Sequence, residues 1–153
     1  MSIAYIGIGS NLGRKKENCL KAIQILKDKG LKVTKQSSMF DTKPWGIKDQ
    51  PEFINMAVEI ETELSPYKLL CLLKKIENEM GRENIIKWGP RIINLDILLY
   101  DDLLMNTYEL KIPHPLMHKR EFVLQPLAEI APEKVHPVLG KKIKDILQEL
   151  LSS

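Results

Sequence analysis

The stretch WGPRIINLDILLY, residues 88–100, decides which fold is expected for this chain. A Gly-Pro-Arg turn leads into an apolar run that is typical of a buried β-strand, and the flanking Leu and Ile residues predict a central one. Asn94 and Asp96 interrupt the run. Because successive strand side chains point to opposite faces, these two point the same way, with Cα atoms about 6.6 Å apart.

This polar pair is a candidate Mg²⁺ site. Buried polar groups cost stability unless something satisfies them. Magnesium prefers oxygen ligands and typically takes one or two carboxylates together with substrate phosphates. The alternative is a polar pair on an exposed edge strand, and the pattern alone leaves both interpretations open.

Strands and helices alternate irregularly around this stretch. We expect strands over residues 3–8, 31–39 and 53–61, and helices over 14–29, 65–80, 122–130 and the C-terminal segment that contains Ile143, Ile146, Leu147 and Leu150. In the strand at 53–61, Ile54, Met56, Val58 and Ile60 face the core, whereas Phe53, Asn55 and Ala57 face the other way. The helix at 14–29 presents Cys19, Leu20, Ala22, Ile23 and Leu26 on one face.

This order of elements predicts an α+β fold, with a mainly antiparallel sheet and helices packed on one or both faces. No linker-like stretch divides the chain, so we expect a single domain over residues 1–153. Hydrophobic residues make up 44% and charged residues 28%, which is ordinary for a globular protein. The net charge of +3 is too small to argue for nucleic acid and suits an anionic small substrate equally well.

The compartment follows from what the sequence lacks. The N-terminus has no charged segment followed by an apolar one, so we expect no signal peptide. No apolar run approaches the roughly 20 residues of a membrane span. Cys19 and Cys71 have neither zinc-ligand nor disulfide-framework spacing, which favours buried thiols in a reducing compartment. We therefore expect a cytoplasmic protein with no membrane and no nucleic-acid partner.

Several basic residues are candidate phosphate ligands, because an Arg guanidinium is planar, always charged and suited to phosphate oxygens. They are Arg82, Lys87, Arg91 and Arg120. Arg91 follows Gly-Pro, which restricts its position, and Arg82 begins a polar loop that could close over a substrate. Scattered basic residues are usually plain surface, and that interpretation applies most strongly to Lys87.

Other residues suggest a site for a flat ring. Phe53 and Phe122 could stack on it, although Phe is more often core. Asn55 carries paired donor and acceptor groups that suit the edge of a heterocycle. His114, held between two prolines, could bind a ligand or simply fix a turn. Glu77 lies within the apolar stripe of its helix, either at the edge of that stripe or aimed into a site.

The chain has neither a G-x-x-x-x-G-K-[ST] loop nor a Rossmann fingerprint, and no Ser-His-Asp or Cys-His nucleophile stands out. Any chemistry would depend on positioning and charge stabilisation, as in phosphoryl transfer. An RNA-binding domain of similar fold would need aromatic residues on a sheet face near basic residues. Only 6% of the residues are aromatic, which disfavours that alternative.

The motifs together resemble the family of 6-hydroxymethyl-7,8-dihydropterin pyrophosphokinases of folate biosynthesis. The resemblance covers nearly the whole chain and rests on AYIGIGSNLG at 4–13, DQPEFIN at 49–55, Ile76-Glu77 with Gly81-Arg82, WGPR at 88–91, LDIL at 95–98, PHP at 113–115, and Arg120 with FVL at 122–124. It implies a ferredoxin-like α+β fold. It also implies transfer of pyrophosphate from ATP to the pterin hydroxymethyl group, with release of AMP.

The resemblance also implies roles for particular residues. Two Mg²⁺ ions would bridge ATP to positions 94 and 96, and Arg82 and Arg91 would neutralise charge on the transferred group. The pterin would be bound by Phe53, Phe122, Asn55, Thr42, Pro44 and Trp45. ATP would be bound by Lys87, Trp88, Ile97, His114 and Arg120. The flexible loops of the family correspond to residues 9–14, 43–52 and 82–90, and we expect a monomer whose partners are these two small molecules.

The chain departs from the family pattern in its charges. The family normally has Asp where this chain has Asn94, a neutral residue with a single acceptor oxygen. Asn84 and Lys87 stand where Arg is common, which thins the positive charge of the same loop. The loss at position 94 should weaken metal binding. One alternative to an active enzyme is therefore a family member that binds pterin and nucleotide but barely turns over.

Overall fold

The structure is a computed structural model, and it describes residues 1–42, 52–81 and 92–153. Its main sheet contains β1 (Ser2–Ser10), β2 (Lys32–Gln36), β3 (Phe40–Thr42), β4 (Phe53–Thr62) and β5 (Asn94–Tyr100). The strand order is β2-β4-β1-β5, with β3 also paired to β4. Every pairing of these strands is antiparallel, as the sequence predicts.

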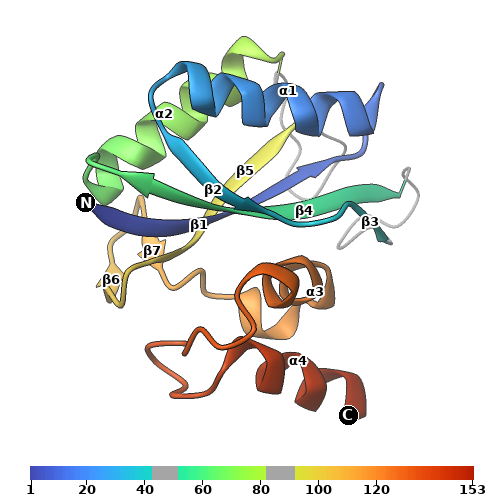
Figure 1. Cartoon of the computed structure of the whole chain (residues 1–153), viewed down its shortest axis with the longest axis vertical. Helices are drawn as coiled ribbons and strands as arrows, with labels where there is room; N and C mark the ends of the chain where they lie inside the picture. Colours follow the sequence, from blue (N-terminus) through green and yellow to red (C-terminus); the bar gives the residue numbers. More distant parts are fainter. Residues whose placement is uncertain (43–51, 82–91) are drawn as a thin grey trace.

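Helices cover both faces of this sheet and make three layers (Figure 1). Helices α1 (Lys15–Asp28) and α2 (Pro66–Glu79) lie on one face, and α3 (Glu121–Ile130) and α4 (Ile143–Ser152) lie below the other. A short hairpin of β6 (Met105–Asn106) and β7 (Lys111–Ile112) and a 3₁₀ turn, η1 (Met117–Lys119), connect β5 to α3. No helix in the described ranges is long and apolar enough to cross a membrane.

Each face of the sheet has its own core, and β4 belongs to both. Ile54, Met56, Val58 and Ile60 are buried with residues of α1 and α2, which confirms the predicted alternation. Ala57, on the opposite face, is buried with residues of α3 and α4. Both faces of β4 are therefore covered, and an alternating pattern alone does not show that.

Helix α2 begins and ends where the sequence predicts. Ser65 is its N-cap, and the Ser65 side chain accepts a hydrogen bond from the Lys68 amide at 3.3 Å. Pro66 occupies the first helical position, and Gly81 follows the helix with a φ of +90°. Local signals in the sequence therefore determine both ends of α2.

Two expectations about packing are wrong. Among the strands that the structure describes, β5 lies at the end of the order, so it is an edge strand there and not a central one. Its apolar side chains are buried because they belong to the cores on both faces of the sheet. Its outer edge is covered separately: the Leu95 amide donates to Glu77 of α2, and the Leu98 carbonyl accepts from the His114 amide. Leu20 is 50% exposed, because it lies beyond the edge of the stripe through which α1 packs.

Candidate active site

Two rows of residues cross β4, β1 and β5 on the face that α3 covers. In one row Gly9 pairs with Asn55 on one side and with Asn94 on the other. In the next row Gly7 pairs with Ala57 and with Asp96. Paired residues of neighbouring strands point to the same face, and the strands are about 4.8 Å apart. The Asn55 amide and the Asn94/Asp96 pair are therefore separated by bare glycine backbone.

A cavity of about 40 Å³ lies over these rows. Its lining includes the two glycines, Asn55, Asn94, Asp96, Arg120 and Phe122. This volume is little more than one water molecule occupies, so a bicyclic ring requires the cavity to widen. The walls nevertheless have the chemistry that such a ring needs: a flat floor, an aromatic side chain and an amide.

Asn55 is held firmly in this cavity. Only 8% of the residue is exposed, and its Nδ2 donates a hydrogen bond to Thr42 Oγ1 of β3 at 2.6 Å. Phe53, two residues earlier on the same face of β4, is paired with Thr42 across the β3–β4 ladder. Thr42, Phe53 and Asn55 therefore lie together at the β4 end of the rows, and Phe122 lines the same cavity as Asn55.

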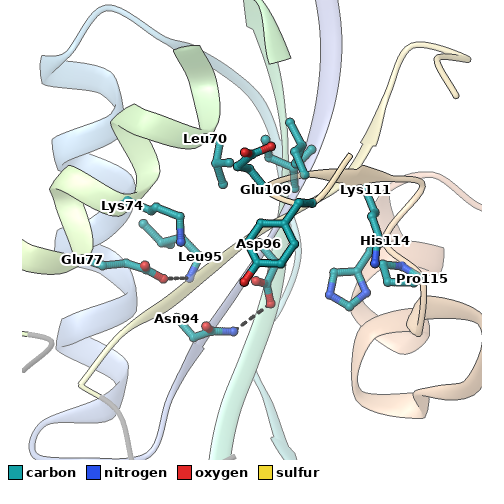
Figure 2. A pocket seen from close by; sticks show the side chains of 13 residues that line it. Leu70, Lys74, Glu77, Asn94, Leu95, Asp96, Glu109, Lys111, His114 and Pro115 are labelled. Carbon is teal, nitrogen blue, oxygen red and sulfur yellow. Dashed lines mark hydrogen bonds between the residues drawn. The ribbon is translucent and has the colours of Figure 1, made fainter. Parts of the chain in front are cut away.

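A second, larger cavity of about 290 Å³ lies on the other side of β5 (Figure 2). Leu70, Lys74 and Glu77 of α2 line one wall, and Asn94, Leu95 and Asp96 of β5 line its base. Ile97 also belongs to the lining. Residues 108–111, His114 and Pro115 complete the lining. The volume lies near the lower end of the range typical of small-molecule sites, about 300–1,000 Å³.

Asn94 and Asp96 are shared by the two cavities. Asn94 Nδ2 donates to Asp96 Oδ2 at 2.8 Å, which confirms that the two side chains point the same way (Figure 2). A carboxylate at the junction of two cavities can act on groups that enter from both. This position is suited to transfer of a phosphoryl group between two bound molecules.

His114 lies beside this junction and is mostly buried. Burial lowers the pKa of its imidazole; the Asp96 carboxylate opposes that shift and Arg120 reinforces it. His114 Nδ1 accepts a hydrogen bond from the Leu116 amide at 3.2 Å. A neutral ring whose Nδ1 accepts a bond carries its proton on Nε2, so His114 both fixes a turn and offers a donor.

Arg120 lies on the smaller cavity, where it is 6% exposed. Its guanidinium carbon is 5.5 Å from the centroid of the Phe122 ring, a geometry that allows a cation–π contact. Arg120 therefore places a permanent positive charge close to Asp96 and beside the ring that would face a flat substrate.

Glu77 proves to be a buried structural carboxylate that also reaches the site. It is 3% exposed, and its Oε2 accepts a hydrogen bond of 2.7 Å from the amide of Leu95 (Figure 2). Leu95 lies between Asn94 and Asp96, so Glu77 holds the backbone that carries both. Glu77 therefore does not lie at the edge of the apolar stripe; it is buried within the stripe and also lines the larger cavity.

Some predicted site residues cannot be compared with the structure. Pro44, Trp45, Arg82, Lys87, Trp88 and Arg91 lie outside the described residues. Other residues line the larger cavity and were not expected, among them Lys74, Tyr108 and Lys111. The helical spacing of Leu70, Lys74 and Glu77 could have indicated Lys74 once Glu77 was suspected. No signal in the sequence marks the residues of the hairpin.

The donor set at the junction fits a divalent cation that arrives with phosphates. Asp96 supplies carboxylate oxygens, Asn94 supplies an amide oxygen, and both are half-buried on one face of β5. Hard cations such as Mg²⁺ prefer such oxygen ligands and need few of them when a nucleotide supplies the rest. Within the described residues no group of three or more His, Cys, Asp or Glu side chains forms a metal cage.

The fold and the site together define an α+β group-transfer enzyme, with one residue pair between two small-molecule cavities. Residues 5–132 match the family of 7,8-dihydro-6-hydroxymethylpterin-pyrophosphokinase (HPPK), and the chain belongs to this family. It is therefore a pyrophosphokinase of folate synthesis, and the ferredoxin-like α+β fold implied by the sequence is confirmed.

Relatives support this assignment over most of the chain. A 2-amino-4-hydroxy-6-hydroxymethyldihydropteridine pyrophosphokinase of Aquifex aeolicus is 42% identical over 97% of this chain and 92% of its own length. The Haemophilus influenzae enzyme of the same name is 49% identical over 90% and 86%. The Plasmodium falciparum HPPK-DHPS crystal structure with STZ-DHP has a TM-score of 0.81 at 19% identity, and this chain covers 43% of that longer chain.

Proposed function

We propose that this chain transfers the pyrophosphoryl group of ATP to the hydroxymethyl group of 6-hydroxymethyl-7,8-dihydropterin. The hydroxymethyl oxygen attacks the β-phosphorus and loses its proton. The bond from that phosphorus to the oxygen bridging to the α-phosphorus breaks, and AMP leaves with that oxygen. The observation that carries this proposal is the position of Asn94 and Asp96, which line both cavities.

The smaller cavity would take the pterin. The Asn55 amide, tied to Thr42, would bind the edge of the ring, and Phe53 and Phe122 would lie against its faces. Two strand spacings, about 10 Å, separate the β4 and β5 positions of each row. A bicyclic ring whose edge contacts Asn55 would therefore extend across Gly9 and direct its hydroxymethyl group toward Asp96.

The larger cavity would take ATP. Ile97 would lie against the adenine ring, and the His114 Nε2 proton would be directed to a phosphate oxygen. Arg120, on the pterin side, would stabilise negative charge on the transferred group. Pro44 and Trp45 would help hold the pterin, Lys87 and Trp88 would bind ATP, and Arg82 and Arg91 would neutralise phosphate charge. Both cavities are built from one copy of the chain, so we also propose a single domain over residues 1–153 that acts as a monomer.

Two Mg²⁺ ions would be held by the Asp96 carboxylate and the Asn94 amide oxygen together with the phosphates of ATP. When bound, such ions neutralise phosphate charge and polarise the phosphoryl group for attack. The protein's own contribution is to hold Asp96 at the junction of the two cavities and to orient the hydroxymethyl group. The chain thereby supplies positioning, as expected for phosphoryl transfer.

The test is a product assay on wild type and two Asp variants. Wild type should form AMP only when ATP, Mg²⁺ and the pterin are all present. Asp96→Ala should lower the rate by at least about 100-fold, because metal-assisted charge stabilisation is worth several kcal/mol. Asp145→Ala, an exposed change on α4, is the control and should keep the wild-type rate. Activity of Asp96→Ala, full activity in excess EDTA, or release of ADP in place of AMP would contradict the proposal.

A further inference from the structure

Gly9 has no backbone reason to be glycine. It lies inside β1, paired on both sides, and its φ is not among the positive values found at Gly13, Gly30, Gly81 and Gly140. Glycine within a strand weakens it and often marks a place where another group approaches closely. The requirement for glycine at position 9 therefore comes from the space above its Cα.

That space is occupied by the side chain of Asn55. A Cβ atom built on Gly9 would lie 2.7 Å from Asn55 Oδ1, closer than real Cβ contacts come. The other atoms near it are Phe53 Cδ1 at 3.6 Å and Asn55 Cγ at 3.7 Å, which are ordinary contacts. The conflict is therefore specific to one oxygen atom, and neither the aromatic ring nor the neighbouring backbone takes part in it.

Asn55 has little freedom to move away. Its Nδ2 is bound to Thr42 Oγ1 at 2.6 Å, and the residue is almost fully buried. In this orientation Oδ1 extends from β4 over the central strand and into the smaller cavity. An acceptor oxygen there is suited to the N–H groups along the edge of an amino-substituted heterocycle.

We propose that Gly9 is the positioning residue for Asn55: the bare Cα of Gly9 lets the Asn55 amide oxygen lie over β1, where it selects rings that carry N–H donors on one edge. This inference rests on the proposed function, because the ring in question is the pterin. Any side chain at position 9 would turn the amide and misplace its oxygen, although Gly9 itself would not bind the N–H groups of the ring.

A double-mutant cycle tests the inference, with Gly9→Ala, Asn55→Ala and the double variant. The readout is the dissociation constant for 6-hydroxymethyl-7,8-dihydropterin, measured by titration calorimetry in the presence of Mg²⁺ and a non-hydrolysable ATP analogue. Gly9→Ala should weaken pterin binding at least about tenfold, because a buried hydrogen-bonding group is left misplaced. It should change the dissociation constant for the analogue less than about twofold, because that ligand occupies the other cavity.

The cycle distinguishes positioning from general damage. If Gly9 acts through Asn55, the effect of Gly9→Ala on pterin binding should be much smaller once Asn55 is Ala, because only direct contact of the added methyl group with the ring that crosses position 9 remains. If its effect is the same in both backgrounds, or absent in wild type, the inference is wrong. If Gly9→Ala alone does not fold but the double variant does, the clash with Asn55 is confirmed; if neither folds, the inference is overturned.

The roles of Asn55 and Gly9 can be disproved separately. If Asn55→Ala binds the pterin as tightly as wild type, the assignment of Asn55 within the proposed function is wrong. If Asn55→Ala weakens binding but does not couple to Gly9→Ala, only the role of Gly9 is wrong. Asn55→Ser is a milder second background, because it also removes the oxygen that conflicts with a Cβ at position 9.

Discussion

A single amide distinguishes the junction of this enzyme from the pair of carboxylates that its family resemblance implies. Asn94 donates to Asp96 at 2.8 Å, so it occupies one lone pair of the carboxylate that would bind a cation. To bind a cation itself, the amide must turn its oxygen outward. Compared with Asp, Asn94 lacks a negative charge. Its hydrogen bond to Asp96 also competes with a cation for the carboxylate that remains.

Asn94→Asp should raise activity. A unit charge about 4 Å from its partner is worth up to roughly 4 kcal/mol at an effective dielectric constant of 20, before solvation is counted. We expect a lower Mg²⁺ concentration at half-maximal rate and at least about a tenfold gain in kcat/KM. Gln24→Glu is the matched control: it is the same change of amide to carboxylate, on the exposed face of α1.

The same variant separates an active enzyme from a family member that only binds. If Asn94→Asp gains no rate while binding of both substrates is preserved, the low-turnover alternative is favoured. If Gln24→Glu gives an equal gain, the effect comes from net charge and not from the site.

The two cysteines should differ sharply in reactivity. Cys19 is completely buried, as expected, and burial raises the pKa of its thiol to about 11. Cys71 is exposed, so the expectation of a buried thiol is wrong for this residue. The thiolate is the reactive form, so one thiol per native chain should react rapidly with DTNB. Both should react in denaturant. Rapid modification of native Cys71→Ser would show that Cys19 is accessible after all.

At the scale of elements, the attachment of β5 to α2 is the connection most specific to this site. An edge strand presents unpaired backbone amides, and here one of them is satisfied by a buried carboxylate. The Glu77–Leu95 bond thus does two things: it closes the edge of the sheet, and it holds the segment that bears Asn94 and Asp96.

Glu77→Ala should lower the free energy of unfolding by about 1–3 kcal/mol, because the buried Leu95 amide loses its acceptor. Glu77→Gln, which keeps an acceptor oxygen, should lose less. Urea denaturation measures both. Glu79→Ala on the same helix is the control, since its ion pair with Lys29 is long, at 3.7 Å, and partly exposed, and should contribute at most about 1 kcal/mol. Equal effects of the two alanine changes would contradict the role of Glu77.

The sequence predicts the helices and strands better than it predicts which of them pack against one another. The alternation at 54–60 and the cap at Ser65 are local signals, and the structure confirms both. The run at 95–99 correctly indicates burial on both faces of the sheet but not whether the strand is central. The cover over the edge of β5 comes from α2 and from residues near His114, which are distant in sequence, so a central strand and a covered edge strand have the same pattern.

At the scale of the whole molecule, the register in which β1 pairs with β4 and β5 determines which residues meet in the site. The polar pair on β5 could be recognised from its spacing, and Asn55 from its position on the face away from the first core. That Gly7 and Gly9 separate them is determined by how β1 pairs with both neighbours. Strand pairing across tens of residues leaves no local signal, which is why the floor of the smaller cavity could not be predicted.

Global stability should depend on pH through His136, in the segment that joins α3 to α4. His136 is 4% exposed, and its Nδ1 accepts hydrogen bonds from the amides of Val138 and Leu139 at 3.2 and 3.1 Å. Burial lowers the pKa of His136 below its usual 6.5, and the neighbouring His118 adds to the shift. The unfolded chain therefore binds a proton that the native state does not.

It follows that the contribution of His136 is fully present above about pH 6.5 and is lost as the pH falls toward its folded value. We expect the free energy of unfolding to be lower at pH 5.5 than at pH 7.5, measured by urea denaturation. His136→Asn offers an acceptor oxygen to the same two amides and does not titrate, so its decrease over this range should be smaller. His114 also has a lowered pKa and acts in the same direction in both proteins, so it cancels in the comparison. Identical pH profiles would mean that His136 takes up its proton without disturbing the packing of α4 on α3.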